Sequence, residues 1–477
     1  MLRSFLVYLP STILARIASF VVILAGTRLL DPAEYGHLAL ITLIGEWADM
    51  VLTNWTRIGL ARLGTREEGL SRELAVRMTG VAAACTALAM VASSLAARVL
   101  SPEAGAPMIG ALLLYLPSIA VARMGIALLQ SARQERSASA LEGVRALLVT
   151  STSVSVMIAS RSYIATSVAT STITLLVGGV TVVLGFRATR RTGPTNTSLR
   201  DVAFYAGPLI AIAALGQIIT GLDKALLKSF HDAAALGYYA ASFSIARAGF
   251  DALAIAMNTG TFVRTSALFN EGRHDRARKL LSRQSGLIIA LALPALATLL
   301  AARDTIAAAV LPPDYRPVFV VAAPVVAAGA VLLNLKNFVY DNVFHLHLRN
   351  LRQVPTLLVG ALVAVLLGLL LLPVHPVHGA TVMWIGGAAA SLLLSVALTS
   401  PLMRIPFPWT PLARSLGVGL ATWGAITWIE QLLEPSVGLP IRLLIECGLG
   451  LCGMGLSLRW NLVSMAADSS FDTGRTA

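Results

Sequence analysis

The chain is poor in charge and in cysteine. Of its 477 residues only 13% are charged, about half the share of a soluble domain, whereas 56% are hydrophobic. The three cysteines, Cys85, Cys447 and Cys452, lie in apolar runs and lack the spacing of metal ligands. The sequence therefore excludes a disulfide-stabilised scaffold and a cysteine metal centre.

Several motifs of enzymes and binding domains are also missing. The sequence has no G-x-x-x-x-G-K-[ST] loop, so it does not bind ATP through a P-loop, and it has neither H-E-x-x-H nor G-x-S-x-G. It has no basic patch interleaved with aromatic residues, which excludes the usual nucleic-acid surfaces. His375 and His378 flank one short turn, where we expect a solvated pair rather than a metal site. We expect no metal, no cofactor and no nucleic-acid partner.

The chain does contain a series of apolar runs, each long enough to cross a bilayer about 30 Å thick as a helix. A β-barrel would show short alternating segments instead, so the predicted fold class is an all-α polytopic membrane protein. Fourteen spans are predicted, near residues 6–28, 37–58, 78–100, 107–130, 145–161, 164–186, 203–222, 236–258, 284–303, 317–340, 355–374, 379–402, 414–430 and 440–459.

The distribution of positive charge predicts the orientation. With fourteen spans and a cytoplasmic N-terminus, 25 of the 37 Lys and Arg residues lie on the cytoplasmic side, 8 lie outside and 4 lie within spans. This excess follows the positive-inside rule, and it places both termini in the cytoplasm. We interpret the first span as uncleaved, because Arg16 interrupts the apolar region that a signal peptide needs.

An internal repeat divides the chain. The segments Asp31–Ala39 and Asp232–Ala240 carry Asp, Gly and Ala at the same spacing, so that Gly36 matches Gly237. Both copies lie between two spans on the same side, which indicates a parallel repeat with an axis along the membrane normal. We predict two pseudo-symmetric six-helix lobes, then two further helices and a cytoplasmic tail, at residues 1–190, 200–402, 403–459 and 460–477. Residues 259–283 read as a short basic amphipathic helix near the inner surface.

Four cations interrupt the spans: Arg16, Arg123, Arg247 and Lys336. A charge at the bilayer centre costs roughly 2.5–3.5 kcal/mol, so such residues usually face inward or are paired. Arg123 and Lys336 lie nearer to the cytoplasmic ends of their spans, and we expect their long side chains to reach the interface. Arg16 and Arg247 lie too deep for that, which makes them the stronger candidates for a binding site.

Four acids also lie within spans: Glu46, Asp49, Asp251 and Glu446. Glu46 and Arg16 lie equally far from Asp31, so a helical hairpin turning there would place them at similar depth. The repeat also matches Glu46 with Arg247. Two interpretations stay open for the charged residues at this depth: they form a structural ion pair, or they line a cationic cavity with a titratable partner.

Two segments resemble signatures of a known family. The run from Thr27 to Gly36, Thr-Arg-Leu-Leu-Asp-Pro-Ala-Glu-Tyr-Gly, resembles the opening of polysaccharide flippases of the multidrug/oligosaccharidyl-lipid/polysaccharide (MOP) exporter superfamily. Asp223 and Lys224, followed by an apolar run, Gly237 and Tyr239, resemble the signature that opens the second half. The family typically has Arg where this chain has Lys224.

The resemblance implies a function and a site. Such a flippase translocates undecaprenyl-pyrophosphate-linked oligosaccharide across the bacterial cytoplasmic (inner) membrane for lipopolysaccharide O-antigen, capsule or exopolysaccharide synthesis, alongside a polysaccharide polymerase and chain-length machinery. The polyprenyl tail would stay in membrane lipid. Family flippases carry cavity arginines on the first, second and eighth spans, which correspond here to Arg16, Arg57 and Arg247. With Lys336, these are the predicted pyrophosphate-binding residues, and Glu46, Asp49 and Asp251 are predicted to pair with them or to couple an ion. The mechanism expected is alternating access of two lobes without ATP.

Three alternatives stay open. A drug or cation antiporter of the same superfamily would need an anionic cavity, which the central arginines disfavour. A lipid II flippase shares the predicted span number and the cationic cavity. A membrane enzyme such as a polymerase or ligase would need a sizeable external loop with acid–base residues, and the sequence has none.

Overall fold

The fold was obtained as a computed structural model, which describes residues 2–63, 70–189, 199–433 and 437–473. In this part of the chain every element is helical, and the predicted all-α fold class is confirmed. Each predicted span coincides with a helical segment, and eleven of the described helices are long and apolar enough to cross a membrane. The predicted lobe boundary near residues 190–200 lies mostly outside the described residues.

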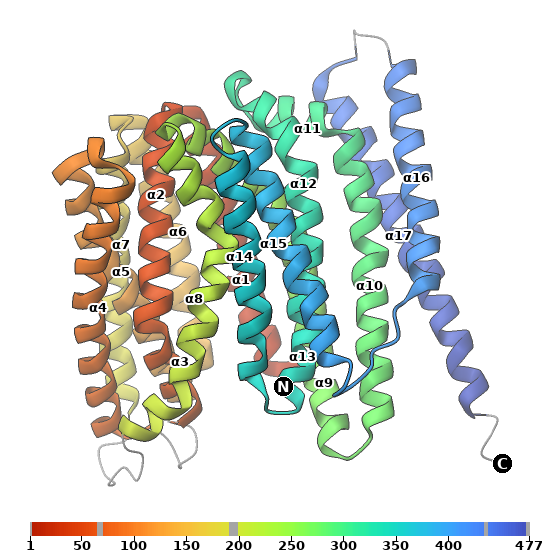
Figure 1. The fold of residues 1–477 in the computed structure, drawn as a ribbon. Helices are drawn as coiled ribbons and strands as arrows, with labels where there is room; N and C mark the ends of the chain where they lie inside the picture. Colours follow the sequence, from red (N-terminus) through yellow and green to blue (C-terminus); the bar gives the residue numbers. More distant parts are fainter. Residues whose placement is uncertain (1, 64–69, 190–198, 434–436, 474–477) are drawn as a thin grey trace. The chain divides into compact units, whose positions relative to one another are not determined.

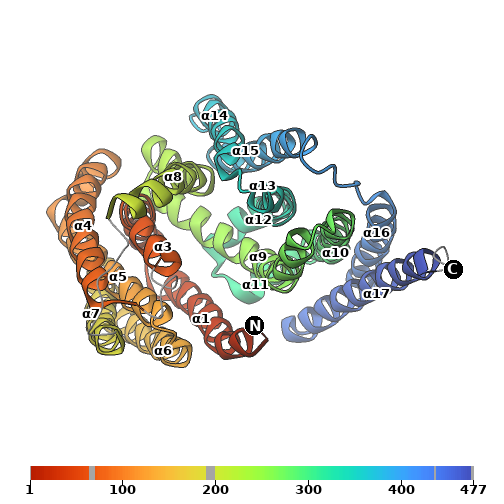
Figure 2. The same ribbon diagram turned by 90° about the horizontal axis from the view of Figure 1, so that it is seen from below.

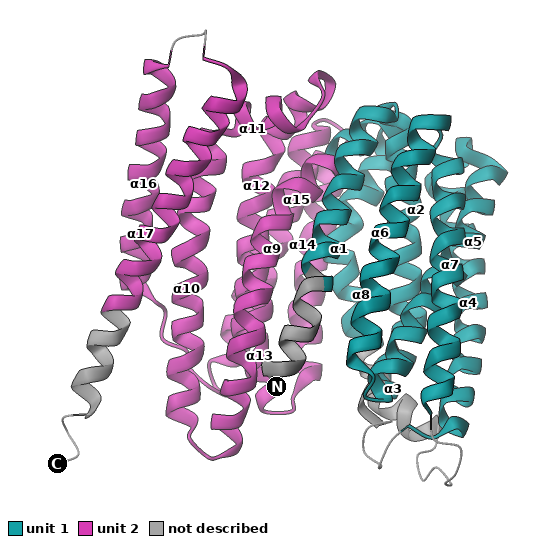
Figure 3. Ribbon diagram, turned by 180° about the vertical axis from the view of Figure 1, so that it is seen from behind, with its two compact units in different colours: residues 1–240 teal, residues 241–477 magenta. Residues whose placement is uncertain are grey.

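The chain forms two compact units, residues 1–240 and 241–477 (Figure 3). The helical elements of the first unit are α1 (Leu2–Leu29), α2 (Pro32–Ala48), η1 (Asp49–Thr53), α3 (Asn54–Leu63), α4 (Arg72–Leu100), η2 (Pro102–Ala104), α5 (Gly105–Ser131), α6 (Glu135–Ser160), α7 (Tyr163–Ala188), α8 (Leu199–Phe230) and the start of α9 (Ala233–Asn270) (Figure 1).

The second unit contains the rest of α9 and the helical elements that follow it. These are α10 (His274–Ala301), α11 (Arg303–Val310), η3 (Pro313–Tyr315), α12 (Arg316–Leu335), η4 (Lys336–Tyr340), α13 (Asp341–Leu346), η5 (Asn350–Arg352), α14 (Gln353–Leu371), α15 (Pro376–Thr399), α16 (Trp409–Leu432) and α17 (Leu439–Thr473). The separate amphipathic helix predicted at 259–283 was wrong, because α9 continues to Asn270 and α10 begins at His274 after a tight turn.

Small residues hold the helices of the first unit together. Helices α5, α6 and α7 lie side by side when the unit is seen along its helices (Figure 2). A Cβ atom added to Gly178 of α7 would lie 2.8 Å from the Cα of Ala122 in α5, and one added to Gly125 of α5 would lie 2.8 Å from Thr181. In a membrane, such close backbone approach replaces the hydrophobic effect as the source of helix association.

Helix α8 belongs to the first compact unit, although the repeat assigns it to the second lobe. The reason lies in its contacts with α3, η1 and α2. At the contact with α2, a Cβ atom on Gly221 would lie 2.7 Å from Leu43 and 2.8 Å from Trp47. The compact units and the repeat therefore describe different things, namely packing and internal symmetry. The lobes defined by the repeat stay a proposal.

The two copies of the repeat meet directly at the start of α2 and the start of α9. A Cβ atom on Gly36 would overlap the carbonyl oxygen of Ala233, and one on Gly237 would overlap the carbonyl oxygen of Pro32. The repeat matches Gly36 with Gly237 and Pro32 with Ala233, so each contact is the counterpart of the other. Glycine is required at both places because the two backbones leave no room for a side chain.

We expect Gly36→Ala to destabilise the protein. A glycine-to-alanine change inside a helix ordinarily stabilises by up to about 1 kcal/mol, but here the added methyl group meets a backbone oxygen, and overpacking typically costs about 1–3 kcal/mol. The midpoint of thermal unfolding in detergent measures this, and Gly237→Ala should lower it similarly.

The matched control for this prediction is Gly110→Ala in α5, where nothing lies within 4 Å of the added atom. Its unfolding midpoint should stay the same or rise. Equal effects of the Gly36 and Gly110 substitutions would show that the close contact does not exist.

Candidate functional site

A network of two carboxylates and two guanidinium groups lies inside the first unit. Nη1 and Nη2 of Arg57 each donate to an oxygen of Asp49 at 2.8 Å. Nη1 of Arg123 donates to Oδ2 of Asp49 at 2.5 Å, and its Nη2 donates to both oxygens of Glu46 at 2.7 and 2.9 Å. Asp49 is fully buried and the Arg57 side chain is 9% exposed, so their charges are neutralised away from water.

A π-helical turn, η1, places Asp49 and Arg57 on one face. Eight residues of regular α-helix turn through about 800°, which would leave the two side chains about 80° apart. The five residues of η1 are wound more loosely, with the N–H of Asn54 donating to the carbonyl of Asp49, and this removes much of the offset. Thr53, within the same turn, also donates its hydroxyl to the Asp49 carboxylate.

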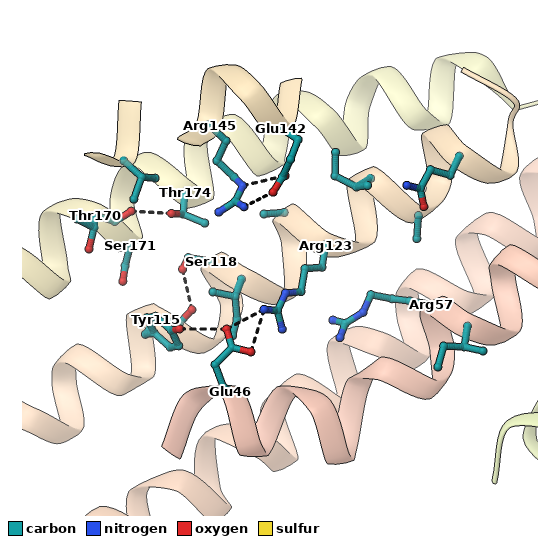
Figure 4. A pocket seen from close by; sticks show the side chains of 17 residues that line it. Glu46, Arg57, Tyr115, Ser118, Arg123, Glu142, Arg145, Thr170, Ser171 and Thr174 are labelled. Atoms are coloured by element: carbon teal, nitrogen blue, oxygen red, sulfur yellow. Dashed lines mark hydrogen bonds and ion pairs between the residues drawn. The ribbon is translucent and has the colours of Figure 1, made fainter. Parts of the chain in front are cut away.

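A cavity of about 610 Å³ opens beside this network (Figure 4). Glu46, Arg57 and Arg123 form one side, and polar and apolar side chains, mostly of α5, α6 and α7, form the rest. These further polar lining residues are Tyr115, Ser118, Gln130, Glu142, Arg145, Thr170, Ser171 and Thr174. Glu142 and Arg145, three residues apart on α6, form an ion pair of their own.

The charges that line the cavity are close to balanced. Each of its three arginines is bonded to a carboxylate of Glu46, Asp49 or Glu142. Hydroxyl and amide groups fill much of the remaining polar surface, which suits a neutral ligand rich in hydroxyl groups better than an anion. Among the residues that the structure describes, no group of His, Cys, Asp or Glu side chains is placed to hold a metal ion.

The structure corrects the interpretation of Arg123. Its side chain does not reach for the membrane interface but turns toward Glu46 and Asp49. The partner of Glu46 is therefore Arg123 and not Arg16. Sequence spacing could not reveal this, because residues 46 and 123 lie on helices that are not adjacent in sequence.

The side chain of Lys336 also does not extend to the membrane interface. It is buried, with 1% of its side chain exposed, and its Nζ lies 2.6 Å from Oδ2 of Asp341. Asp341 in turn accepts a hydrogen bond of 2.7 Å from the hydroxyl of Ser395 in α15. Lys336 begins a second π-helical turn, η4, so both units carry such a turn beside a buried ion pair.

In the described part of the chain, the guanidinium group of Arg247, on α9, forms a hydrogen bond through its Nε only. Its Nε donates to Oδ2 of Asp251, one turn later, at 2.6 Å, and Asn334 donates to the other oxygen of Asp251 at 3.1 Å. The guanidinium carbon lies 5.8 Å and 5.3 Å from the ring centres of Phe243 and Trp384. Neither terminal nitrogen of Arg247 bonds to any side chain or backbone group in the described part of the chain.

Arg16 of α1 is exposed in the first unit. Within residues 2–63, 70–189, 199–433 and 437–473 its side chain makes no ion pair or hydrogen bond. Nearby side chains on α1, such as Ile13 and Ile17, are exposed and apolar. Arg16 is thus a cation without a counter-charge on an apolar helix.

The signature residues of the second half form a structural cluster. The hydroxyl of Tyr239 donates to Oδ2 of Asp223 at 2.8 Å, and Nζ of Lys224 lies 3.3 Å from Oδ1 of the same carboxylate. These bonds join the end of α8 to the start of α9. In the first half, Asp31 precedes α2 as its N-cap residue, and Gly36 makes the close contact described above.

Sequence reasoning missed the polar wall that α7 contributes to the cavity. A signal was present, because Thr166, Ser167, Thr170, Ser171 and Thr174 recur at helical spacing within one apolar span. That pattern places hydroxyl groups along a single stripe. Glu142 and Arg145 were also missed, since the predicted span begins only at residue 145, whereas α6 begins at Glu135 and carries both residues.

The chain matches a family model described as "Polysaccharide biosynthesis protein" over residues 23–319. Among curated protein sequences no match was found. Solved structures with a similar fold include the lipid II flippase MurJ in an inward closed conformation, with a TM-score of 0.72 and 11% identity over 96% of this chain and 99% of that chain.

Two further structures of similar fold are MATE transporters. One is an inward-facing multidrug resistance MATE family transporter of the MOP superfamily, with a TM-score of 0.59 and 12% identity over 81% of this chain and 93% of that chain. The other is a mutant of the Vibrio cholerae MATE transporter VcmN, with a TM-score of 0.56 and 14% identity over 83% and 95%. At these identities the likeness concerns the fold alone.

The extent of the family match, the helical fold and the buried charges within apolar helices agree with one another. This chain belongs to the polysaccharide biosynthesis protein family and is a multi-pass membrane protein.

Proposed function

We propose that this protein is a flippase of the MOP superfamily and translocates an undecaprenyl-pyrophosphate-linked oligosaccharide from the inner to the outer leaflet of the bacterial cytoplasmic membrane. The product would serve synthesis of a surface polysaccharide such as O-antigen or exopolysaccharide. The termini would lie in the cytoplasm, and a polymerase with its chain-length machinery would consume the product. Membership in the polysaccharide biosynthesis family supports this class of substrate.

The observation that carries the proposal is the geometry of Arg247. Asp251 holds its Nε, while both terminal nitrogens are without a bond to any described residue. Two parallel N–H donors are the arrangement that binds two phosphate oxygens at once. The aromatic rings of Phe243 and Trp384 restrict the side chain, so less conformational entropy is lost when phosphate binds.

Arg16 is the second proposed phosphate ligand. It carries a charge in an apolar helix without any counter-charge from the described residues, and a pyrophosphate would supply one. Arg57 and Lys336 are weaker candidates, because each would have to leave a buried carboxylate before it could bind phosphate. We assign these two a structural role and keep Arg16 of the first unit and Arg247 of the second unit as the proposed phosphate ligands.

The cavity of the first unit suits the sugar portion of the substrate. Its arginines are already neutralised, so it offers little net attraction to a pyrophosphate. Its hydroxyl and amide groups, among them Ser118, Gln130 and Thr170, can exchange hydrogen bonds with sugar hydroxyls. The polyprenyl chain would stay in the lipid, where its transfer costs nothing.

Asp251 is the proposed coupling group. In the absence of substrate it shares a charge-assisted hydrogen bond with Arg247. A pyrophosphate bound at the two terminal nitrogens would place negative charge beside this carboxylate, and an ion that follows the substrate could compensate it. Glu46 and Asp49 were predicted as further coupling groups. Glu46 is bonded to Arg123, and Asp49 is bonded to both Arg57 and Arg123, so we assign the two acids a pairing role. Alternating access of two lobes would then proceed without ATP.

We expect Arg16→Ala and Arg247→Ala each to reduce transport of a defined lipid-linked oligosaccharide into proteoliposomes at least tenfold. The reason is the loss of charge-assisted hydrogen bonds, worth about 1.5–3 kcal/mol each. Surface glycan should disappear in cells that depend on either variant, while the amount of protein in the membrane stays the same.

The matched control is Arg404→Ala, an exposed cation between α15 and α16, which should transport normally. Export that survives both Arg16→Ala and Arg247→Ala would rule out the pyrophosphate site. The same liposomes loaded with lipid II test the main alternative, because preferential transport of lipid II would make the protein a cell-wall precursor flippase instead.

We expect Asp49→Ala to destabilise the first unit by about 3–5 kcal/mol, because it leaves buried Arg57 without its carboxylate. Adding Arg57→Ala to it should cost less than the sum of the two single changes, since no unpaired charge then remains beside that pair. Thermal or denaturant unfolding in detergent measures the three variants.

Glu73→Gln provides the comparison for this cycle. Glu73 pairs with Arg77 on the surface of α4, with about half of each side chain exposed, so its loss should change stability by less than about 1 kcal/mol. Additive effects of Asp49→Ala and Arg57→Ala would mean that the two residues do not act as a pair.

A further inference from the structure

A carboxyl group that takes no part in the function proposed above lies buried in α17 of the second unit. It belongs to Glu446, whose exposed fraction is 0%. The hydroxyl of Thr305, in α11, donates a hydrogen bond of 3.0 Å to Oε1 of Glu446. Oε2 of Glu446 is buried and accepts no hydrogen bond from a donor in the described part of the chain. An ionised carboxylate with an unsatisfied oxygen is costly in such surroundings, so this group requires a further partner.

The neighbouring helix brings a second carboxyl group to this place. Glu430 lies in the last turn of α16 and is half-buried, and its side chain is in hydrogen-bond contact with that of Glu446. Helices α16 and α17 pack along each other, which explains how the two residues meet (Figure 2). Ionised carboxylates can only accept hydrogen bonds. The contact therefore requires that one of the two groups carries a proton.

Further charged groups near the pair come from α17 and α11. Arg442 acts on both carboxyl groups from one turn earlier on α17, and Asp304 of α11 acts on Glu430. Asp304 in turn lies 3.6 Å from Arg303. Helix α10 also packs against α17, but it has no ionisable side chain between residues 284 and 301. These residues are the charged surroundings of the pair in the described part of the chain.

The balance of these charges leaves a place for one proton. Arg303 offsets the charge of Asp304, and Arg442 offsets one of the two glutamates. A proton on the second glutamate makes the whole group neutral, which is the state of lowest cost among apolar helices. The thiol of Cys447, next to Glu446 in the sequence, adds no charge in its ordinary neutral form.

A proton suits this pair better than a metal ion. Ca²⁺ takes about six to eight oxygen ligands, and Mg²⁺ demands a nearly octahedral set. Two carboxyl groups and the hydroxyl of Thr305 offer fewer ligands than that. Within the described ranges, no group of His, Cys, Asp or Glu side chains is placed to hold a metal ion. A shared proton needs only the two facing oxygens.

We propose that Glu430 and Glu446 bind one proton between them and that this shared proton joins α16 to α17. Thr305 fixes the position of Glu446 from α11, so the site connects three helices of the second unit. When the pH rises and the proton leaves, two like charges face each other and the contact between the helices weakens. The proposal does not depend on the proposed function, because it concerns the binding of a proton and not the transport of a lipid.

Infrared difference spectroscopy of the full-length protein in detergent tests the site, because a protonated carboxyl group absorbs apart from a carboxylate. At neutral pH we expect Glu446→Gln to lose the absorption of one carboxylic acid relative to the native protein. Glu430→Gln should lose the same amount, since its amide group can donate the hydrogen bond that Glu446 then accepts as a carboxylate. The double change should lose no more than either single change, which is the signature of one shared proton.

The pH dependence of stability provides a second measurement. The midpoint of thermal unfolding of the native protein should fall as the pH rises from neutral to alkaline, because the folded state then loses a proton that it binds more tightly than the unfolded state does. Glu446→Gln should show a shallower fall, since its amide stays uncharged. The matched control is Glu271→Gln, whose glutamate side chain is 55% exposed in the same unit. It should resemble the native protein in both measurements.

The possible outcomes separate a shared proton from its alternatives. Loss of absorption in Glu446→Gln but not in Glu430→Gln would indicate a lone protonated carboxyl group, and additive loss in the double variant would indicate two independent ones. Absence of loss in both single variants would mean that the pair holds no proton. Absorption that disappears when sodium ions are added at constant pH would make a cation the occupant. Each of these four results would overturn the proposal.

Discussion

The cost of charge inside a bilayer governs the arrangement of this protein. A cation at bilayer depth needs a carboxylate, a hydrogen-bond network or an anionic ligand. The structure uses the first two for Arg57, Arg123 and Lys336, each of which is bonded to an acid. Arg247 shares an acid but keeps two donors open, and Arg16 has no acid from the described chain. The degree of neutralisation is therefore what distinguishes structural cations from candidates for ligand binding.

Local helix geometry makes this neutralisation possible. Both π-helical turns, η1 and η4, begin at a residue of a buried ion pair, Asp49 in the first unit and Lys336 in the second. An extra residue in a turn shifts the following side chains around the helix, so that partners several residues apart in sequence can meet. The same loosening interrupts the regular hydrogen bonds of a span in the place where charges already require polar surroundings.

The repeat supplies the second constraint, through backbone contact instead of charge. Gly36 and Gly237 occupy matching positions, and each lies against the carbonyl group of the other copy's segment. The two glycines recur at matching positions of the repeat because of steric exclusion, since any side chain there would separate α2 from α9. The neighbouring Asp223 and Tyr239 tie the same region by a hydrogen bond. The residues that resemble a family signature therefore build the scaffold, while the polar cavity is lined by residues of less recognisable pattern.

The sequence by itself determined the fold class, the approximate spans and the family resemblance. Apolar runs of bilayer length leave helices as the only choice, and Gly36 and Gly237 recur at a spacing that reveals the repeat. The sequence also identified the intramembrane cations but not their partners. Only the tertiary structure decided that Arg123 turns to Glu46, that Lys336 is buried against Asp341, and that the hydroxyl stripe of α7 faces a cavity. The physical reason is that depth in a span follows from position along the chain, whereas pairing depends on helix rotation and on contacts between helices far apart in sequence.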